Sequence, residues 1–75
     1  MTMTTIQTTT TSGIQVRLVG HGVEASRQAC GGTQEYATAR WVDGETVAWR
    51  DADGWVTAAL AAEVDAALRV AIASR

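Results

Sequence analysis

The spacing of the hydrophobic residues changes once along the chain, and this change constrains the fold more than any other feature. Apolar and polar side chains alternate over residues 14–19, which places Ile14, Val16 and Leu18 on one side. A period of two is typical of a strand with one buried face. From Val56 onward the apolar residues recur at helical spacing in a stretch rich in alanine, the best helix former. The sequence therefore predicts strands followed by a C-terminal helix.

The register of the first hairpin follows from its turn. Glycine, histidine and glycine at residues 20–22 are typical of a tight turn. A two-residue loop there sets Leu18 opposite Val23 and Arg17 opposite Glu24. The second of these pairs is a favourable cross-strand pair of opposite charges. We predict the first hairpin in this register.

Further strands are predicted around a second turn. Residues 23–29 form the return strand of the first hairpin, with a short helix as the alternative. Residues 30–33 contain two glycines and form a turn. Two more strands follow at about residues 35–42 and 45–50. The expected architecture is α+β: an antiparallel sheet of three to four strands in a meander, packed against one C-terminal α-helix.

The loop between the last two strands decides which side chains share a face. A two-residue loop at Asp43 and Gly44 would mix polar and apolar side chains on both faces. A three-residue loop at residues 42–44 sets Ala39 opposite Val47 and makes one face apolar. Because the register must keep the buried face apolar, we predict the three-residue loop. The apolar face is then Ala37, Ala39, Trp41, Val47 and Trp49, and the polar face is Tyr36, Thr38, Arg40, Thr46, Ala48 and Arg50.

The first twelve residues are dominated by threonine, which favours extended backbone. Few of these residues can bury an apolar side chain. A disordered tail and an edge strand with threonines on its solvent face are therefore both open for residues 1–12. Residues 13–75 are expected to form a single α+β domain, since the length allows only one.

No covalent or metal staple is expected in this short chain. It contains one cysteine, Cys30, and one histidine, His21. A disulfide within the chain is therefore excluded, and a structural zinc site would need four ligands. Small domains without a staple often depend on a partner, so self-association as a dimer is an expectation. The lone cysteine, with no secretory leader and no membrane-length apolar run, indicates a cytoplasmic protein.

Catalysis and cofactor binding are not expected. His21 and Cys30 lie in separate turns, and no third residue is placed to orient them as base and nucleophile. The sequence at residues 51–54 resembles only the start of a calcium loop, because Trp55 and Ala62 stand where later oxygen ligands are required. We predict a protein that is not an enzyme and that binds no metal and no cofactor.

The charge of the chain points to a protein partner. The net charge is −2, and all six basic side chains are arginines. A nucleic-acid binder needs a basic stripe along the phosphates, so direct binding of nucleic acid is not expected. Acidic residues gather in the second half of the chain instead. They suit a partner protein with a basic surface.

Tryptophan and the acidic turns supply the predicted binding site. The strand register places Trp41 and Trp49 in the core beneath the helix. Trp55 either closes the end of the core or lies exposed as an interface anchor. Asp51 or Asp53 is expected to cap the helix. The predicted partner-binding residues are Asp43, Glu45, Asp51, Asp53 and Trp55.

In size and layout the chain is similar to anti-CRISPR proteins, small accessory proteins of phages and mobile elements. This resemblance is carried by the hairpin at residues 36–50, the acidic turn at residues 51–54 and the alanine-rich helix at residues 56–74. It implies a non-enzymatic inhibitor that binds the surface of a larger host nuclease complex. These proteins share no signature, so no functional residue is carried over. The alternative is a small structural or assembly subunit that acts as a homodimer.

Overall fold

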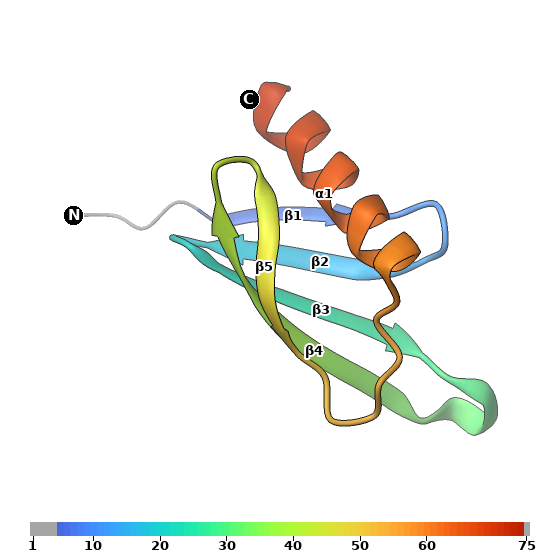
Figure 1. Ribbon diagram of the computed structural model, residues 1–75. Helices are drawn as coiled ribbons and strands as arrows, with labels where there is room; N and C mark the ends of the chain where they lie inside the picture. Colours follow the sequence, from blue (N-terminus) through green and yellow to red (C-terminus); the bar gives the residue numbers. More distant parts are fainter. Residues whose placement is uncertain (1–4, 75) are drawn as a thin grey trace.

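The computed structural model describes residues 5–74, apart from the side chain of Cys30, as an antiparallel sheet with one helix on one face (Figure 1). The strands lie side by side in the order of the sequence. The α+β fold is confirmed, with five strands rather than three to four. No helix in the described residues is long and apolar enough to cross a membrane. The elements are β1 (Thr5–Thr9), β2 (Gln15–Val19), β3 (Gly22–Gln28), a 3-10 turn (Cys30–Gly32), β4 (Gln34–Val42), β5 (Glu45–Arg50) and α1 (Ala58–Ala73).

The additional strand comes from the threonine-rich segment. β1 pairs with β2 at the edge of the sheet, and Ile6 lies opposite Leu18. Threonine suits this position because its β-branched side chain packs well on a pleated sheet. Of the two alternatives for residues 1–12, Thr5–Thr9 form the edge strand. Residues 1–4 lie outside the described residues.

The first hairpin has the predicted register. Leu18 lies opposite Val23 and Arg17 opposite Glu24. Nη2 of Arg17 is 2.6 Å from Oε2 of Glu24. Gly20 has a φ of 60°, a value that this short loop requires and that glycine adopts without strain. The segment that follows is a strand and not the alternative short helix.

The second hairpin differs from the prediction. Val42 pairs with Glu45, so the loop contains two residues, Asp43 and Gly44, and not three. Their φ values are 52° and 83°. Positive φ at both loop positions is the type I′ geometry that Asp-Gly sequences favour, because its twist matches the twist of the flanking strands. The predicted register was wrong because it assumed that β5 is a regular strand.

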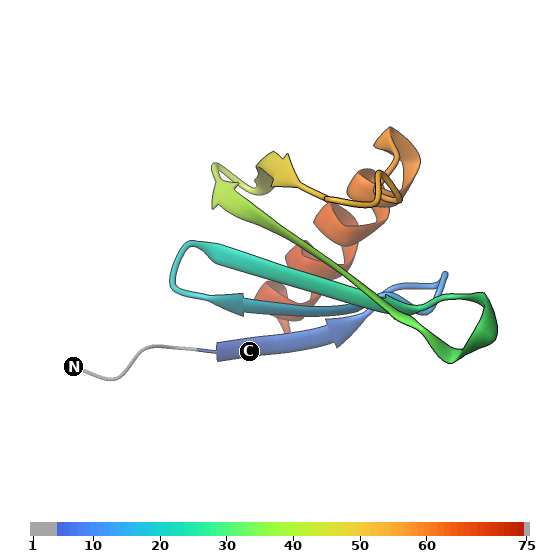
Figure 2. The same cartoon turned by 90° about the horizontal axis from the view of Figure 1, so that it is seen from below.

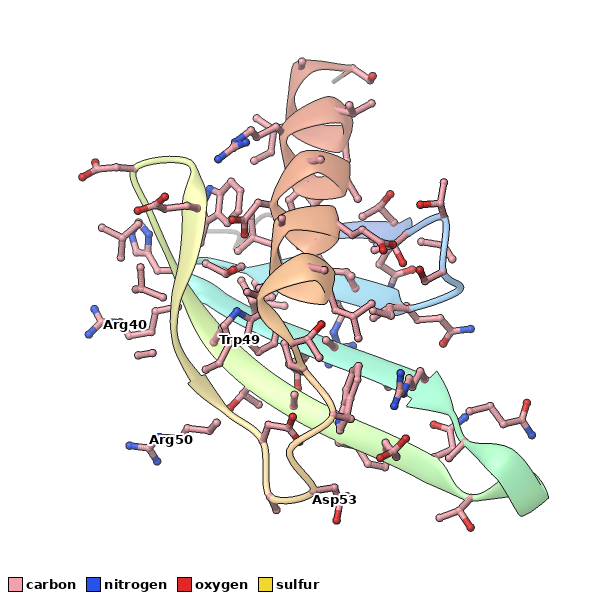
Figure 3. All side chains as sticks on the ribbon, turned by 45° about the vertical axis from the view of Figure 1, so that its right-hand side comes forward. Arg40, Trp49, Arg50 and Asp53 are labelled. Atoms are coloured by element: carbon pink, nitrogen blue, oxygen red, sulfur yellow. The ribbon has the colours of Figure 1, made fainter. Side chains whose placement is uncertain are left out.

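A β-bulge in β5 corrects the alternation of side chains beyond this loop. The register shifts between Thr38 and Arg40, and Ala48 on the opposite strand has a φ of 56°. One residue of β5 is therefore left over, and the alternation restarts after it. Trp49 returns to the side of the helix and packs against the core (Figure 3).

Between the loop and the bulge the faces remain mixed: Thr46 lies opposite Trp41 on the helix side, and Val47 lies opposite Arg40 on the other side. The predicted place of Val47 on the apolar face was therefore wrong, because the two-residue loop shifts the register by one residue there.

We expect Ala48→Gly to stabilise the protein. An L-residue in the left-handed region costs roughly 1–2 kcal/mol, a cost that glycine lacks. The greater freedom of glycine in the unfolded chain offsets part of the gain. The remaining gain of about 1 kcal/mol raises Tm by roughly 4–8 °C, which thermal unfolding followed by circular dichroism measures. The matched control, Ala62→Gly in α1, should lower stability by about 1 kcal/mol, and shifts of the same sign would contradict the bulge geometry.

The core lies between α1 and the face of the sheet that it covers. Val64 and Leu68 of α1 are 1% and 0% exposed. They share one cluster with Ala25, Ala37 and Ala39 of the central strands. α1 approaches the sheet most closely over β1, β2 and β5, and side chains of the cluster fill the space between the helix and the central strands. Burial of this apolar surface is the main term that stabilises so short a chain.

The helix also holds the edge strand β5. Oδ1 of Asp65 accepts hydrogen bonds from the backbone N–H of Thr46 at 2.9 Å and from its hydroxyl at 2.5 Å. Nε of Arg69 donates to the carbonyl oxygen of Gly44 at 2.7 Å. These bonds satisfy polar groups that an edge strand would otherwise leave to solvent or to another chain. One edge of the sheet is thereby tied to α1.

Candidate binding surface

The four acidic residues of the predicted site do not form one cluster. Asp43 and Glu45 lie at the hairpin between β4 and β5, whereas Asp51 and Asp53 lie in the loop after β5. β5 has six residues, which span about 20 Å at the usual rise of a strand. In Figure 1 the hairpin between β4 and β5 and the loop after β5 lie at opposite ends of this strand. The structure therefore has two acidic ends and no single acidic site.

Trp55 belongs to the core and is not an exposed anchor. It is 5% exposed, and its indole N–H donates to the carbonyl oxygen of Tyr36 at 3.2 Å. The guanidinium of Arg27 lies 4.7 Å from the ring centroid. A helical projection places Trp55 outside the apolar stripe, but α1 begins only at Ala58. The loop before the helix directs the indole toward β3 and β4, so Trp55 is not available for partner binding.

Asp51 organises the loop that carries Trp55. Its carboxylate accepts the backbone N–H of Asp53 at 3.2 Å and that of Val56 at 2.5 Å. The helix is capped instead by Thr57, whose Oγ1 accepts a backbone N–H of the first turn. The prediction that Asp51 or Asp53 caps α1 was wrong, because several loop residues separate both from the first turn. Asp51 is a structural residue of the loop.

Substitution of the two aspartates should separate a structural role from a surface role. Asp51→Ala removes an acceptor of two backbone N–H groups, and we expect a loss of about 1–3 kcal/mol in the free energy of unfolding. In Asp53→Ala the lost carboxylate is exposed, and the change should stay within about 0.5 kcal/mol. Urea unfolding of the two variants measures the difference. Equal losses would show that the loop does not depend on the Asp51 carboxylate.

The two residues considered for catalysis lie apart. His21 is exposed in the turn between β2 and β3, and Cys30 lies in the turn between β3 and β4. The seven residues of β3 separate these turns. Among the side chains that the structure describes, which do not include that of Cys30, no three His, Cys, Asp or Glu are grouped so that they could hold a metal ion. His21 and Cys30 are therefore not brought together by the fold.

The face of the sheet opposite α1, which we call the outer face, is covered by no element that the structure describes. Figure 2 shows α1 on one side of strands β1 to β3 and no element on the other. Alternation along the strands directs polar side chains to this side. A depression of about 670 Å³ lies on the outer face. The outer-face residues used below are Arg17, Glu24, Tyr36, Thr38, Arg40 and Arg50.

Tyr36 is the aromatic residue of the outer face. It is 66% exposed and lines the depression. A second depression of about 450 Å³ lies between Tyr36 and Arg50. The backbone of Tyr36 is fixed by its hydrogen bond to the indole of Trp55. The ring is thus presented to solvent from a strand that the core holds in place.

Three arginines share the outer face, and they differ in their pairing. Arg17 forms an ion pair with Glu24. Arg40 and Arg50 are exposed, and neither has an ion-pair partner among the described residues. In Figure 3 both point to the same side of the sheet, away from α1. Two guanidinium groups are therefore available on this face for an acceptor outside the chain.

The sequence predicts on which face of the sheet Tyr36, Arg40 and Arg50 lie, but it does not identify them as candidate binding residues. Tyr36, Arg40 and Arg50 belong to the polar face that the alternation predicts, yet none is among the predicted binding residues. The signal that identifies them is a large aromatic ring at a solvent-facing strand position. Tyrosine and arginine are enriched where proteins bind one another, whereas the core of this protein needs neither side chain there.

The chain matches no family model, and the searches of curated proteins and of solved structures also gave no match. The functional argument therefore starts from the surface of the protein itself.

Proposed function

We propose that this protein is a non-enzymatic inhibitor that acts in the cytoplasm by binding a larger protein complex through its outer face. The proposal keeps the function implied by the resemblance to anti-CRISPR proteins, with a host nuclease complex as the target. The observation that carries it is Tyr36, which is 66% exposed on an uncovered sheet face beside two exposed arginines.

The outer face has the composition and the area that binding requires. Tyrosine supplies a large contact area at low cost in side-chain entropy, and arginine donates several hydrogen bonds from one planar group. A typical interface buries about 800 Å² on each partner, about a sixth of the 4941 Å² accessible surface of this chain. One face of the sheet can therefore form a complete interface while α1 and the core remain unchanged.

The acidic residues that the sequence predicts as the binding site have a secondary role in this proposal. Asp43 and Glu45 lie at one end of β5, and Asp51 and Asp53 at the other. They flank the strand that contains Arg50. Charges at such positions act mainly at the rim of an interface, where they steer association and set its salt dependence. Basic groups on the partner would meet these two ends.

Affinity capture with matched variants tests the proposal. The purified protein, its Tyr36→Ala variant and its Val70→Ala variant are used to capture a nuclease complex from lysate of the native host. Val70 is a matched control because it is also 66% exposed but lies on α1. We expect the wild-type protein and Val70→Ala to retain the complex and to suppress its cleavage of DNA or RNA. Tyr36→Ala should do neither.

Retention of the same complex by Tyr36→Ala would contradict the outer face as the binding surface. A retained complex with undiminished nuclease activity would contradict the inhibitory function. Both outcomes can be interpreted only if Tyr36→Ala is folded, which circular dichroism checks. Because the side chain of Tyr36 is mostly exposed, we expect its removal to change stability by about 0.5 kcal/mol or less.

The homodimer alternative is favoured by one observation, the exposure of Val70 and Ile72 on α1, which are 66% and 38% exposed. Two side chains form a small patch compared with the area that a stable interface buries. We therefore expect light scattering to give the 7.9 kDa mass of one chain. Twice that mass, reduced by Val70→Asp, would favour the assembly subunit over the inhibitor.

A further inference from the structure

We infer that the outer face binds a short acidic segment of its protein partner in extended conformation, with carboxylates on Arg40 and Arg50. The inference rests on the proposed function, because it specifies the chemistry of the partner at that same face. It differs from the expectation of a basic partner surface, which relied on acidic residues that the structure separates. The argument has three steps: the spacing of the arginines, their electrostatic state and the acidic ends of β5.

The spacing of the two arginines matches that of alternate residues in an extended chain. Arg50 pairs with Thr38, and Arg40 lies two residues beyond Thr38 on β4. Arg40 and Arg50 are thus diagonal neighbours on the two sides of the bulge, a relation that in a regular ladder places Cα atoms about 7–8 Å apart. Side chains two residues apart on one side of an extended segment are separated by about 6.5–7 Å. Two carboxylates at such positions can each meet one guanidinium.

The electrostatic state of the two arginines favours a carboxylate partner. Two like charges at diagonal positions repel each other, and neither has an ion-pair partner among the described residues. Arg17, by contrast, is already neutralised by Glu24 on the adjacent strand. A carboxylate can accept two parallel hydrogen bonds from one guanidinium, the strongest arrangement open to an exposed charge. The outer face therefore has two vacant positions for acidic groups.

The acidic ends of β5 restrict the ligand to a short stretch of negative charge. Asp43 and Glu45 lie beyond one end of this surface, and Asp51 and Asp53 beyond the other. A single strand of nucleic acid carries a phosphate at every nucleotide. Where it extends beyond the two arginines, its phosphates would meet carboxylates at both ends of β5. The net charge of −2 adds to this repulsion. A protein segment can carry two acidic residues and be neutral or basic on either side.

Selection from a library of short random peptides tests the inference without knowledge of the partner. The immobilised protein selects peptides, and the enriched peptides are titrated against wild-type protein and variants by fluorescence anisotropy. A single-stranded oligothymidine is titrated in parallel. We expect enriched peptides with two acidic residues at alternate positions, bound about tenfold or more weakly by Arg40→Gln/Arg50→Gln. Arg27→Gln/Arg69→Gln removes the same charge on the helix side of the sheet, where Arg27 covers Trp55 and Arg69 contacts Gly44, and should retain most of the affinity.

The possible results separate this inference from the proposed function. Peptides without acidic residues that require Tyr36 but neither Arg40 nor Arg50 would overturn the inference and leave the binding face intact. Equal losses in the two double variants would show that net charge, not position, governs binding, which also overturns the inference. Tighter binding of oligothymidine than of any peptide would reassign the face to nucleic acid. If the enriched peptides bind the Tyr36 variant and the Arg40/Arg50 double variant as tightly as the wild-type protein, both the inference and the proposed binding face are contradicted.

Discussion

Leu68→Ala should destabilise this protein severely. Leu68 is 0% exposed and lies in the centre of the contact between α1 and the sheet. Truncation of a fully buried leucine costs about 3–5 kcal/mol, because the transfer free energy of the removed atoms is lost and a cavity remains. A chain of this length has a total stability of about 4–11 kcal/mol. A single core substitution therefore removes a large fraction of the stability.

Urea unfolding followed by circular dichroism measures this effect. Val70→Ala is the matched control, since it truncates an exposed residue of the same helix and should change stability by about 0.5 kcal/mol or less. If both substitutions shift the urea midpoint equally, α1 does not pack on the sheet through the face described above. The ratio of the two effects thus tests which side of the helix is buried.

Trp55→Ala should be destabilising to a similar degree. The substitution empties a buried position, removes the hydrogen bond to the carbonyl oxygen of Tyr36 and leaves Arg27 without the ring that it covers. We expect a loss of about 3–5 kcal/mol from truncation of the buried tryptophan. Any loss of partner binding in this variant would follow from unfolding and would not show a contact at Trp55.

Trp55→Phe separates the two contributions of this side chain. Phenylalanine keeps most of the apolar volume but donates no hydrogen bond, so the carbonyl oxygen of Tyr36 loses its partner. We expect a loss of about 1–3 kcal/mol, the usual cost of an unpaired buried polar group. Chemical unfolding monitored by the remaining tryptophans measures it. Wild-type stability in Trp55→Ala would contradict burial of the indole and restore Trp55 as a candidate surface residue.

Local patterns predicted most of the elements. The alternation of Ile14, Val16 and Leu18 identified a strand with one buried face, and the turn after it determined the pairing of Arg17 with Glu24. These predictions hold because side-chain direction in a strand follows the period of the backbone and needs no knowledge of distant residues. The C-terminal helix was predictable for the same reason, since its apolar residues recur at helical spacing.

The second hairpin shows where local patterns are insufficient. An Asp-Gly sequence favours a two-residue type I′ loop, while the apolar pattern of a regular β5 favours a three-residue loop. The protein forms the two-residue loop, which sets Val47 opposite Arg40, and a bulge with positive φ at Ala48 then returns Trp49 to the helix side. A bulge leaves no mark on the sequence when the residue is alanine. The packing of Trp49 against the core offsets the conformational free energy that the positive φ of Ala48 costs.

The candidate site depended on the tertiary structure for a related reason. Acidic residues that are close in sequence lie at the two ends of β5, because the backbone of a strand is extended and its two ends are far apart. Trp55 entered the core because the loop held by Asp51 turns it toward β3 and β4. Whether a residue is buried depends on what covers it, and that was not visible in the spacing of residues 51–56.

The sequence by itself determined the α+β class, the first hairpin and the polar character of one sheet face, because each follows from the period of side chains along a single segment. Only the tertiary structure decided that α1 covers the opposite face, that Trp55 is buried, and that Tyr36, Arg40 and Arg50 are exposed. These outcomes depend on the relative placement of distant segments. That placement depends on the burial of apolar surface over the whole chain, and it cannot be deduced from the pattern of any single segment.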